Sequence, residues 1–355
     1  MIERPALPPE EFADRVVRLL NDGALALMLS IGHQAGLFDT MSGLPPSTSQ
    51  QIADAAGLNE RYVREWLGAL TAGKIVRYDA SDNTYALPVE HAACLTRAAG
   101  PENLAIQSQY IPLLAAVQPE ILECFRKGGG VPYEAFDDFH RIMAEESGSA
   151  HDVALIDTTL PLVPGLVERL TQGIDVLDVG CGSGHAINLM AAAFPKSRFR
   201  GYDFSLEAIE RGRAEAGERG LSNVEFETRD VTKLGENEAF DLITAFDAIH
   251  DQADPAAVLA GIAKALRSDG TFLMVDVAAS SHLHENLDHP LGPLLYTISC
   301  MHCMTVSLSL GGAGLGAMWG EQKAQEMLEE AGFGCVETKR IDDDISSTYY
   351  IARKS

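Results

Sequence analysis

The chain has 355 residues, of which 46% are hydrophobic, so it is long enough for two folded domains, each with an apolar core. Its 51 acidic and 27 basic residues give a net charge of −24, which disfavours nucleic acid as a partner because most of the surface would repel a polyanion. The sequence shows neither the basic start and apolar core of a signal peptide nor an apolar run long enough to cross a membrane, so we expect a cytoplasmic protein.

Residues 10–38 are predicted to form one long helix, because apolar side chains recur there at intervals of three and four residues. One face of this helix must therefore pack on another surface. The apolar stripe consists of Phe12, Val16, Leu19, Leu20, Ala24, Leu27, Met28 and Ile31.

Two short helices joined by a tight turn follow. Residues 47–58 form a capped helix that ends at Gly57, and Asn59 caps a second helix over residues 60–73. This arrangement predicts a helix-turn-helix. Two short strands, 74–78 and 84–87, add a hairpin and complete a winged helix, which we assign to a domain of residues 1–95.

Winged helices commonly read DNA, so a regulator is the alternative to an enzyme. The candidate recognition helix carries Glu60 and Glu65 beside Arg61 and Arg64, and its charges nearly cancel. A DNA-reading helix normally has an excess of basic residues, because phosphate contacts supply most of the affinity. The balance of charges therefore disfavours DNA reading, which stays the alternative to the role in dimerisation and substrate covering that a family resemblance described below implies.

Residues 96–170 are predicted to be a helical linker that roofs a pocket, and a glycine-rich turn begins the next domain, residues 171–355. Residues 174–185 indicate a buried strand that ends on Asp178, then a turn with Gly180, Gly182 and Gly184, then a helix starting near His185. Glycine permits unusual backbone angles and lets a ligand approach closely, while the start of a helix offers unpaired N–H groups. The pattern predicts a site for a nucleoside-type cofactor.

A second strand, residues 198–202, ends at Asp203, which is predicted to bind a ribose because a carboxylate accepts hydrogen bonds from both hydroxyl groups of a diol. Three further strands are expected at residues 223–227, 240–247 and 270–277, with a helix over 255–266. Residues 335–339 and 347–353 fit a closing antiparallel hairpin. The segment 246–251 follows a strand and is therefore expected at the ligand-binding edge of the sheet.

The run Asp-Val-Gly-Cys-Gly-Ser-Gly at 178–184, with Tyr-Asp-Phe-Ser at 202–205, resembles the class I S-adenosylmethionine-dependent methyltransferases. The resemblance implies an α/β fold, a Rossmann-like doubly wound sheet of seven strands. It also implies that S-adenosylmethionine is the cofactor and that an acidic residue, here Asp230, lies near its adenine amino group. The implied cofactor contacts are Asp178, Gly180, Cys181, Gly182, Gly184, Asp203, Phe204, Asp230, Val231, Phe246 and Asp247. A nicotinamide enzyme is disfavoured, because the glycine spacing is not that of a dinucleotide fingerprint.

His250 is the candidate catalytic residue. The segment His250-Asp251-Gln252-Ala253-Asp254 is similar to the His-Asp-Trp-x-Asp segment of plant O-methyltransferases, in which the histidine is the general base, and Gln252 replaces the tryptophan here. A hydroxyl acceptor needs such a base, and the pKa of histidine suits the task. Histidines at this place also occur without that role, so a pocket-lining His250 is the alternative.

An insertion over residues 280–320 is expected to form the wall of an apolar acceptor pocket. The candidate pocket residues are Tyr296, Met301, Met304 and Trp319. Cys300 and Cys303 have the spacing of a zinc site, but no second pair lies nearby in the sequence, and the histidines of the insertion fit no common catalytic spacing. We therefore predict no metal.

The sequence as a whole predicts a homodimeric enzyme that methylates a small, partly apolar acceptor, with oxygen as the expected atom. Plant-type small-molecule O-methyltransferases carry the same N-terminal arrangement and use it for dimerisation. The alternative is a winged-helix regulator whose methyltransferase-like domain only senses the cofactor.

Overall fold

The computed structural model describes residues 6–342 and 344–354. The chain divides into two compact units, residues 1–115 and residues 116–355. The boundary between them falls inside the segment 96–170, which the sequence predicts to be a linker. Among the described residues, the first unit has one buried apolar cluster and the second unit has two.

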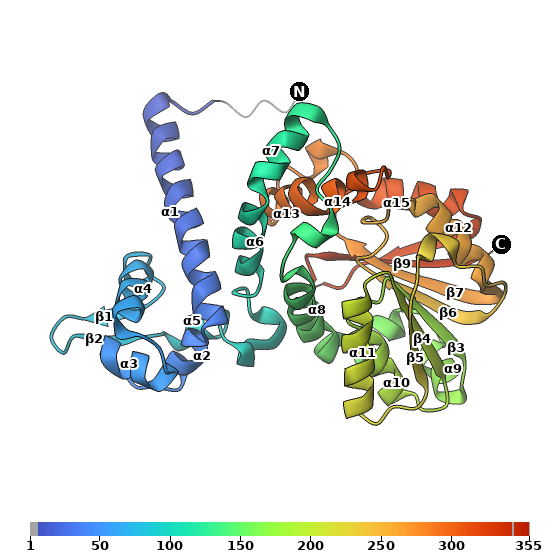
Figure 1. Ribbon diagram of the computed structural model, residues 1–355, viewed down its shortest axis with the longest axis horizontal. Coiled ribbons are helices and arrows are strands. Elements are labelled where there is room, and N and C mark those ends of the chain that lie inside the picture. Colours follow the sequence, from blue (N-terminus) through green and yellow to red (C-terminus); the bar gives the residue numbers. More distant parts are fainter. Residues whose placement is uncertain (1–5, 343, 355) are drawn as a thin grey trace. The chain divides into compact units, whose positions relative to one another are not determined.

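The first unit is a winged helix, as predicted. Its elements, blue in Figure 1, are α1 (Pro9–Gln34), α2 (Leu37–Ser42), α3 (Ser49–Ala56), α4 (Glu60–Ala72), β1 (Arg77–Asp79), β2 (Thr84–Ala86) and α5 (Val89–Ala92). Thr48 and Gln51 form a capping box at the start of α3, and the side chain of Asn59 accepts a hydrogen bond from the N–H of Arg61 at the start of α4. Local sequence signals therefore set the ends of both helices.

The prediction of one helix over residues 10–38 is wrong at its C-terminal end. The helix α1 ends at Gln34, and α2 begins at Leu37. Gly36, at φ 67°, lies in the left-handed region that glycine adopts readily, so the chain can turn there. The apolar spacing continues across the break because Leu37 and Phe38 still point into the core of the unit.

Helix α1 packs closely on α4 because Gly32 of α1 has no side chain at the contact. The indole Nε1 of Trp66 donates a hydrogen bond of 2.9 Å to the carbonyl oxygen of Met28, and the rings of Phe38 and Trp66 lie 5.4 Å apart. A Cβ atom placed on Gly32 would come within 2.6 Å of Trp66 and 2.7 Å of Phe38. Glycine at this position therefore allows the two helices and the two rings to approach.

The second unit contains the predicted seven-stranded sheet. Its strands are β3 (Asp175–Val179), β4 (Arg198–Asp203), β5 (Val224–Thr228), β6 (Phe240–Phe246), β7 (Leu266–Val277), β8 (Phe333–Lys339) and β9 (Ser347–Lys354). The spatial order is β5-β4-β3-β6-β7-β9-β8, and β9 runs antiparallel to both of its neighbours, β7 and β8. The strand predicted at 270–277 begins four residues earlier, because α12 ends at Ala265 and the chain enters the sheet directly.

Helices cover both faces of this sheet. Helices α9 (Leu166–Gln172), α10 (His185–Ala193) and α11 (Leu206–Glu218) pack on one face, and α12 (Pro255–Ala265) and α15 (Gly320–Glu330) on the other. The unit also contains α7 (Gln118–Lys127), α8 (Phe139–Ala154), α13 (Gly292–Ile298) and α14 (Met304–Ser309), while α6 (Tyr110–Ala116) spans the boundary between the units. Neighbouring residues of one strand belong to different cores: Val176 packs with α9 and α10, and Leu177 with α12 and α15. This alternation is the expected result of side chains that point to opposite faces.

The order of the strands reverses at β3. Asp178 lies beside Gly201 of β4 on one side and Thr244 of β6 on the other, and all three strands run parallel. The segments that follow β3 and β6 therefore run to opposite faces of the sheet. A crevice forms at such a switch point, beyond the carboxyl ends of the strands, and it is the usual ligand site of open α/β sheets.

The contact at Gly32 is testable by substitution. Gly32→Ala should destabilise the chain by about 1–3 kcal/mol, because the new methyl group overlaps the rings of Trp66 and Phe38. Gly23→Ala, in the same helix with no atom within 4 Å of the new Cβ, should instead stabilise it by up to about 1 kcal/mol. Urea unfolding of the full chain measures both changes, and equal effects of the two substitutions would contradict this packing.

Candidate active site

A glycine loop leads from β3 to α10, which begins at His185 as predicted. Gly180, Gly182 and Gly184 have φ angles of 69°, 53° and 70°, all in the left-handed region. A Cβ atom on Gly180 or Gly184 would meet neighbouring side chains at 2.6 Å or 2.3 Å, whereas one on Gly182 would meet no atom within 4 Å. The loop is therefore packed at both ends and open at Gly182.

Asp203 ties this loop to the end of β4. Its carboxylate is buried, with Oδ2 accepting a hydrogen bond from the N–H of Gly182 at 2.9 Å and Oδ1 accepting one from the N–H of Ser205 at 2.8 Å. Burial raises the pKa of Asp203 above its ordinary value, and the backbone N–H groups counteract that effect. Each carboxylate oxygen keeps a lone pair for a further donor.

Asp178 is enclosed in the centre of the sheet. It is 1% exposed, and its Oδ1 accepts a hydrogen bond of 2.7 Å from the hydroxyl of Thr244 on β6. Burial raises the pKa of Asp178 to about 7; the bond from Thr244 lowers it, and the charge of Asp203 raises it further. A carboxyl group with this pKa is partly protonated near neutral pH. A neighbouring cation would lower its pKa and favour the ionised form.

The predicted adenine-side residues lie after β5. Asp230 is exposed and begins a short 3-10 turn, η6 (Val231–Lys233). Its Oδ1 accepts a hydrogen bond from the N–H of Thr232 at 3.0 Å, and its Oδ2 accepts one from the Nζ of Lys233 at 2.9 Å. Val231 is buried in the core of the sheet.

Three further predicted cofactor contacts follow strand ends. Phe204 comes directly after Asp203 and is 57% exposed. Phe246 ends β6 and its ring lies 4.9 Å from the ring of His151 in α8. Asp247 has a left-handed φ of 50°, and its N–H donates to the carbonyl oxygen of Val275 at 2.9 Å. This turn begins the segment that carries His250.

His250 is held by a carboxylate that the sequence analysis did not select. The imidazole Nδ1 lies 2.8 Å from Oδ1 of Asp276, the buried residue near the end of β7, and Nε2 lies 3.2 Å from Oδ1 of Asp251. Burial alone would lower the pKa of His250, but the charges of Asp276 and Asp251 together raise it well above its ordinary value. The arrangement therefore fixes the ring orientation and stabilises the imidazolium form.

The four predicted pocket residues have different surroundings in the structure. Trp319 is buried beside the histidine, and its Nε1 donates a hydrogen bond of 3.1 Å to Oδ1 of Asp276. Tyr296 accepts a hydrogen bond from Asn286 through its hydroxyl, and Met301 is partly buried in the turn η8 (Ser299–Cys303). Met304 lines a groove of about 240 Å³ between α7 and α14.

An aromatic cluster lies near the exposed ring of Phe204. The ring of His302 is fully buried and stacks on Phe139 at 3.7 Å, with Tyr133 and Phe136 edge-on to it. Burial lowers the pKa of His302 to about 4, so the ring is neutral at neutral pH. Tyr133 also contacts Phe204, their ring centroids being 5.3 Å apart, and thereby connects this cluster to the end of β4.

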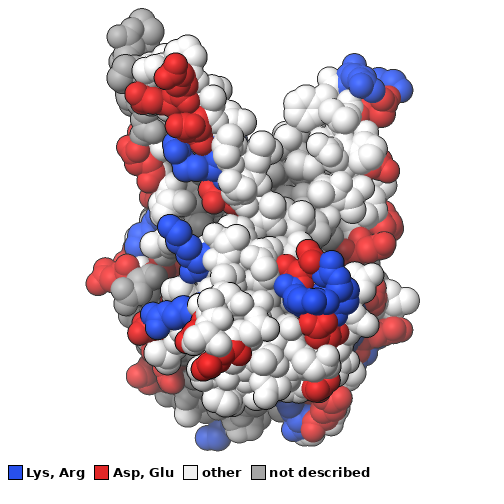
Figure 2. All heavy atoms as spheres, turned by 90° about the vertical axis from the view of Figure 1, so that its left-hand side faces the viewer, with Lys and Arg blue, Asp and Glu red and all other residues white. Residues whose placement is uncertain are grey.

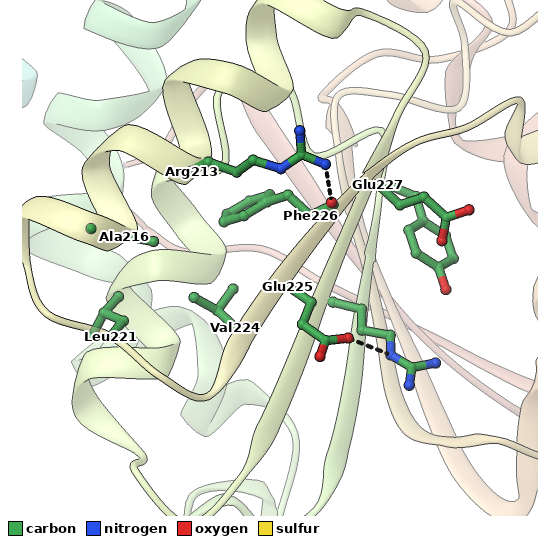
Figure 3. Close-up of a pocket in the computed structure, with 10 residues that line it drawn as sticks. Arg213, Ala216, Leu221, Val224, Glu225, Phe226 and Glu227 are labelled. Atoms are coloured by element: carbon green, nitrogen blue, oxygen red, sulfur yellow. Dashed lines mark hydrogen bonds and ion pairs between the residues drawn. The ribbon is translucent and has the colours of Figure 1, made fainter.

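A larger pocket, of about 750 Å³, lies between α11 and the edge of the sheet at β4 and β5 (Figure 3). Its charged groups already have partners within the pocket. Arg213 donates a hydrogen bond of 2.6 Å to the carbonyl oxygen of Phe226, and Arg200 lies 3.7 Å from Glu225. The glycine loop and Asp203 do not line it, so this pocket is distinct from the switch-point crevice.

The predicted recognition helix of the winged unit pairs its own charges. Arg61 forms an ion pair with Glu65, and Arg64 lies 3.3 Å from Glu60. On the face of the molecule seen in Figure 2, Lys and Arg form small separate groups beside Asp and Glu. This face offers no continuous basic surface for a nucleic acid backbone.

Across the described residues, every helix is too short or too polar to pass through a lipid bilayer.

Comparison with domain families finds two matches. Residues 23–97 match a domain described as Rv2258c-like winged HTH domain, and residues 170–332 match a domain described as Methyltransferase domain. These matches confirm the winged helix and the methyltransferase domain that the sequence analysis predicted.

Similar proteins agree with this assignment. The ubiquinone biosynthesis O-methyltransferase of Neisseria meningitidis is 34% identical over 119 residues, which cover 32% of this chain and 48% of that protein. The chain thus spans about half the length of the curated relatives it matches.

Solved structures resemble the whole chain. The mitomycin 7-O-methyltransferase MmcR has a TM-score of 0.71 at 18% identity, covering 97% of this chain and 98% of that one. Human N-acetylserotonin methyltransferase, solved in complex with S-adenosylmethionine, has a TM-score of 0.66 at 15% identity, covering 99% and 100%. At this level of identity the likeness establishes the fold.

Sequence reasoning missed several residues of the site. Asp276 lies near the carboxyl end of the apolar strand 270–277, as Asp203 does in its own strand, so the same reasoning could have selected it. Tyr133 and Cys303 come from segments far away in the sequence, and no local pattern connects them with His250. Thr244 is recognisable only once the register of β3 and β6 is known.

The raised pKa of Asp178 predicts how stability depends on pH. Because its pKa is about 7 in the folded chain and about 3.8 when unfolded, the folded state binds more protons between these values. Its contribution to the free energy of unfolding therefore falls as pH rises through this window, by on the order of 4 kcal/mol. Asparagine does not ionise, so Asp178→Asn should remove this decrease in the free energy of unfolding. The stability of the variant relative to the parent chain should therefore increase as the pH is raised from 5 to 8.

Asp175→Asn is the matched control on the same strand. Burial raises the pKa of Asp175, but Arg198 and Arg267 lower it overall, so Asp175 is ionised at both pH values. Its substitution should destabilise the chain equally at pH 5 and pH 8. Urea unfolding at the two pH values provides the test, and a pH-independent effect of Asp178→Asn would disprove the assignment.

Proposed function

Because the chain joins a winged helix-turn-helix domain to a methyltransferase domain, we propose that it transfers a methyl group from S-adenosylmethionine to a small, partly apolar acceptor, at an oxygen atom. The observation that carries this proposal is the hydrogen bond that joins the glycine loop, open at Gly182, to the carboxylate of Asp203 at the point where the strand order of the sheet reverses.

The residues present fit this cofactor. The free space at Gly182 accommodates a group packed against the backbone, and Asp203 has lone pairs for the two ribose hydroxyl groups. Gly180, Cys181 and Gly184 complete the loop around the methionyl end. This end carries an ammonium group, and Asp178 is the adjacent carboxyl whose ionised form would balance that charge.

The adenine would lie on the other side of Asp203. We assign its contacts to Phe204 and Val231, with Asp230 as the acceptor for the adenine amino group, whereas Phe246 and Asp247, at the end of β6 on the other side of β3, are assigned to the methionyl end. Phe204 supports this placement because its ring is exposed next to the ribose carboxylate. Asp230 is also exposed and retains acceptor capacity beside its bonds to Thr232 and Lys233.

When bound, S-adenosylmethionine supplies a methyl group on a sulfonium centre that is open to in-line displacement. The chain must then hold the acceptor close and collinear, which lowers the barrier by orientation. His250 is the proposed general base: its neutral form, which is populated as the pH rises above the raised pKa of the ring, takes the hydroxyl proton of the acceptor at Nε2. Asp276 holds Nδ1 and stabilises the imidazolium that forms, as a carboxylate does in other histidine-carboxylate pairs.

The acceptor is expected beside His250, in surroundings that are largely apolar. Trp319 is already next to Asp276, and Tyr133 lies between the ends of β4 and η8, so aromatic rings border the site on two sides. Tyr296 and Met301 extend this surface in the proposal, and Met304 lines the neighbouring groove between α7 and α14. An aromatic or alicyclic hydroxyl compound is the acceptor class that such walls favour.

We also propose that the chain is a homodimer through α1. Several large apolar side chains on this helix are exposed, among them Leu20 at 70%, Leu19 at 58% and Phe12 at 54%. Contiguous exposed apolar surface of this kind marks an interaction site. A second copy of the chain is the partner that would cover it in a self-complementary contact.

Cofactor binding is the direct test of the proposal. In calorimetry with S-adenosylhomocysteine, Asp203→Ala should weaken binding about 10- to 100-fold, because two hydrogen bonds to a charged group are lost. Glu207→Ala is the control, since Glu207 is exposed in the adjoining first turn of α11. Unchanged affinity of the Asp203 variant would place the ribose elsewhere.

With an acceptor identified from a panel of phenols, His250→Ala should lower kcat about 10²- to 10⁴-fold while leaving the affinity for S-adenosylhomocysteine unchanged. Full turnover by this variant would exclude the general base.

The dimer is tested by sedimentation velocity of the full chain. Leu20→Glu should shift the chain from dimer to monomer, because a carboxylate would be buried in an apolar contact. Asp14→Lys, a change of charge at another position of the same helix, should leave the dimer intact. A parent chain that sediments as a monomer at micromolar concentration would rule out the dimer.

A further inference from the structure

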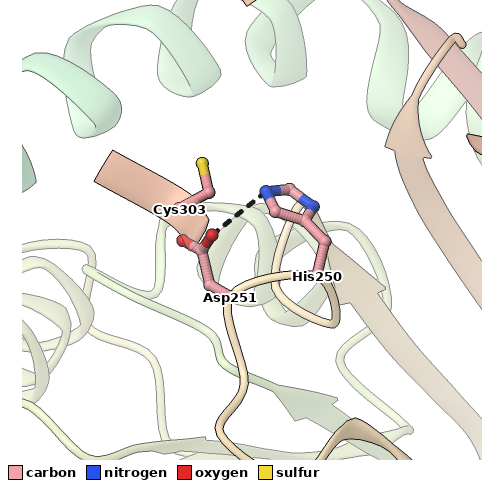
Figure 4. Close-up of side chains that lie close together, drawn as sticks. All are labelled: His250, Asp251 and Cys303. Carbon is pink, nitrogen blue, oxygen red and sulfur yellow. Dashed lines mark ion pairs between the residues drawn. The ribbon is translucent and has the colours of Figure 1, made fainter. Parts of the chain in front are cut away.

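Three potential metal ligands meet beside the proposed base. The Nε2 of His250, a carboxylate oxygen of Asp251 and the Sγ of Cys303 all lie within 4.8 Å of one another (Figure 4). They come from two separate segments, the turn after β6 and the π-helical turn η8. We propose that these three side chains form a binding site for a zinc-class divalent cation, with one coordination position open.

The orientation of His250 is that of a metal ligand. Its Nδ1 forms a hydrogen bond with Asp276, which also accepts a hydrogen bond from Trp319. These bonds fix the orientation of the imidazole ring. Metal-bound histidines almost always use their second nitrogen for such a carboxylate, which sets the tautomer and the ring plane. The remaining nitrogen, Nε2, points toward Asp251 and Cys303 (Figure 4).

Asp251 supplies a separate observation. Its Oδ1 is buried and has no hydrogen-bond partner in the described structure, although Nε2 of His250 is only 3.2 Å away. A buried carboxylate oxygen without a donor is costly. A cation between the carboxylate, the imidazole and the thiol would satisfy this oxygen together with both other groups.

The donor set selects the class of cation. A nitrogen, an oxygen and a sulfur ligand suit Zn²⁺, whereas Mg²⁺ and Ca²⁺ require oxygen ligands. Binding releases the thiol proton of Cys303 and the Nε2 proton of His250, so the two charges of Zn²⁺ are balanced by one thiolate and one carboxylate. Three protein ligands leave the fourth position of a tetrahedral centre for water or another small ligand.

This site differs from the Cys-x-x-Cys spacing considered in the sequence. Cys300 lines the groove between α7 and α14, where Cys124 and Phe125 also lie, and it is absent from the cluster. Cys303, 4% exposed, reaches His250 instead. The two cysteines of one short segment therefore face different surroundings, and Cys300 provides a matched control.

The experiment uses the full chain after treatment with a chelator and gel filtration. Zn²⁺ alone is titrated by calorimetry and in competition with a chromophoric chelator, and Co²⁺ serves as a spectroscopic probe of a thiolate ligand. The parent chain should bind one equivalent and show a cobalt-thiolate charge-transfer band. Cys303→Ser and Asp251→Asn should each weaken Zn²⁺ binding by more than the roughly 10- to 100-fold loss typical of an outer-shell partner.

Cys300→Ser should bind Zn²⁺ like the parent chain. Unaltered binding in Cys303→Ser, an equal loss in Cys300→Ser, or the absence of tight binding would each overturn the site. Thermal unfolding by circular dichroism verifies that every variant is folded. The affinity for S-adenosylhomocysteine, measured on the same metal-free samples, reports separately on the proposed methyltransferase function, so failure of the one is distinguishable from failure of the other.

Discussion

The parallel pairing of β3 with β4 and β6 is the constraint on which the site depends. It places Asp178, Asp203 and the turn that leads to His250 at one edge of the sheet, although they come from three strands. The hydrogen bond from the N–H of Gly182 to Asp203 then fixes the loop against the second strand. A shift of the register by one residue would exchange Asp178 with Leu177 or Val179, and the carboxyl would point into an apolar core.

The site concentrates buried ionisable groups in a domain that is otherwise held together by apolar packing. Asp178, Asp203, His250 and Asp276 are all buried. Burial raises the pKa of Asp178 and Asp203, so the ionised forms of these two carboxyls are costly without a compensating charge. The two apolar clusters on the faces of the sheet offset that cost. A sulfonium and an ammonium group are the kind of ligand charges that such carboxyls would meet under the proposed function.

Sequence alone predicts the parts of this site that are local. Asp178, the three glycines and the start of α10 lie within a few residues of one another, and the end of a strand marks Asp203. The pairing of His250 with Asp276 was missed, because it joins positions 26 residues apart through the contact of β6 with β7. The break at Gly36 was missed for a different reason: the apolar spacing continues on both sides of it, so periodicity did not reveal a change of direction.

The geometry at His250 suits the binding of either a proton or a metal cation. Both require an imidazole ring whose Nδ1 is fixed by a hydrogen bond and whose Nε2 is available. Asp276 orients the ring of His250 in both cases, and Asp251 lies next to Nε2, where either the proton or the cation would bind. In the proposed methyl transfer, Nε2 must be free to accept the acceptor proton, so a cation bound there would compete with catalysis. Cys303 separates the two cases: a proton needs only the imidazole and its carboxylates, whereas a zinc-class cation also requires the thiolate. Recognition of a cation therefore depends on η8, which belongs to the insertion and not to the sheet itself.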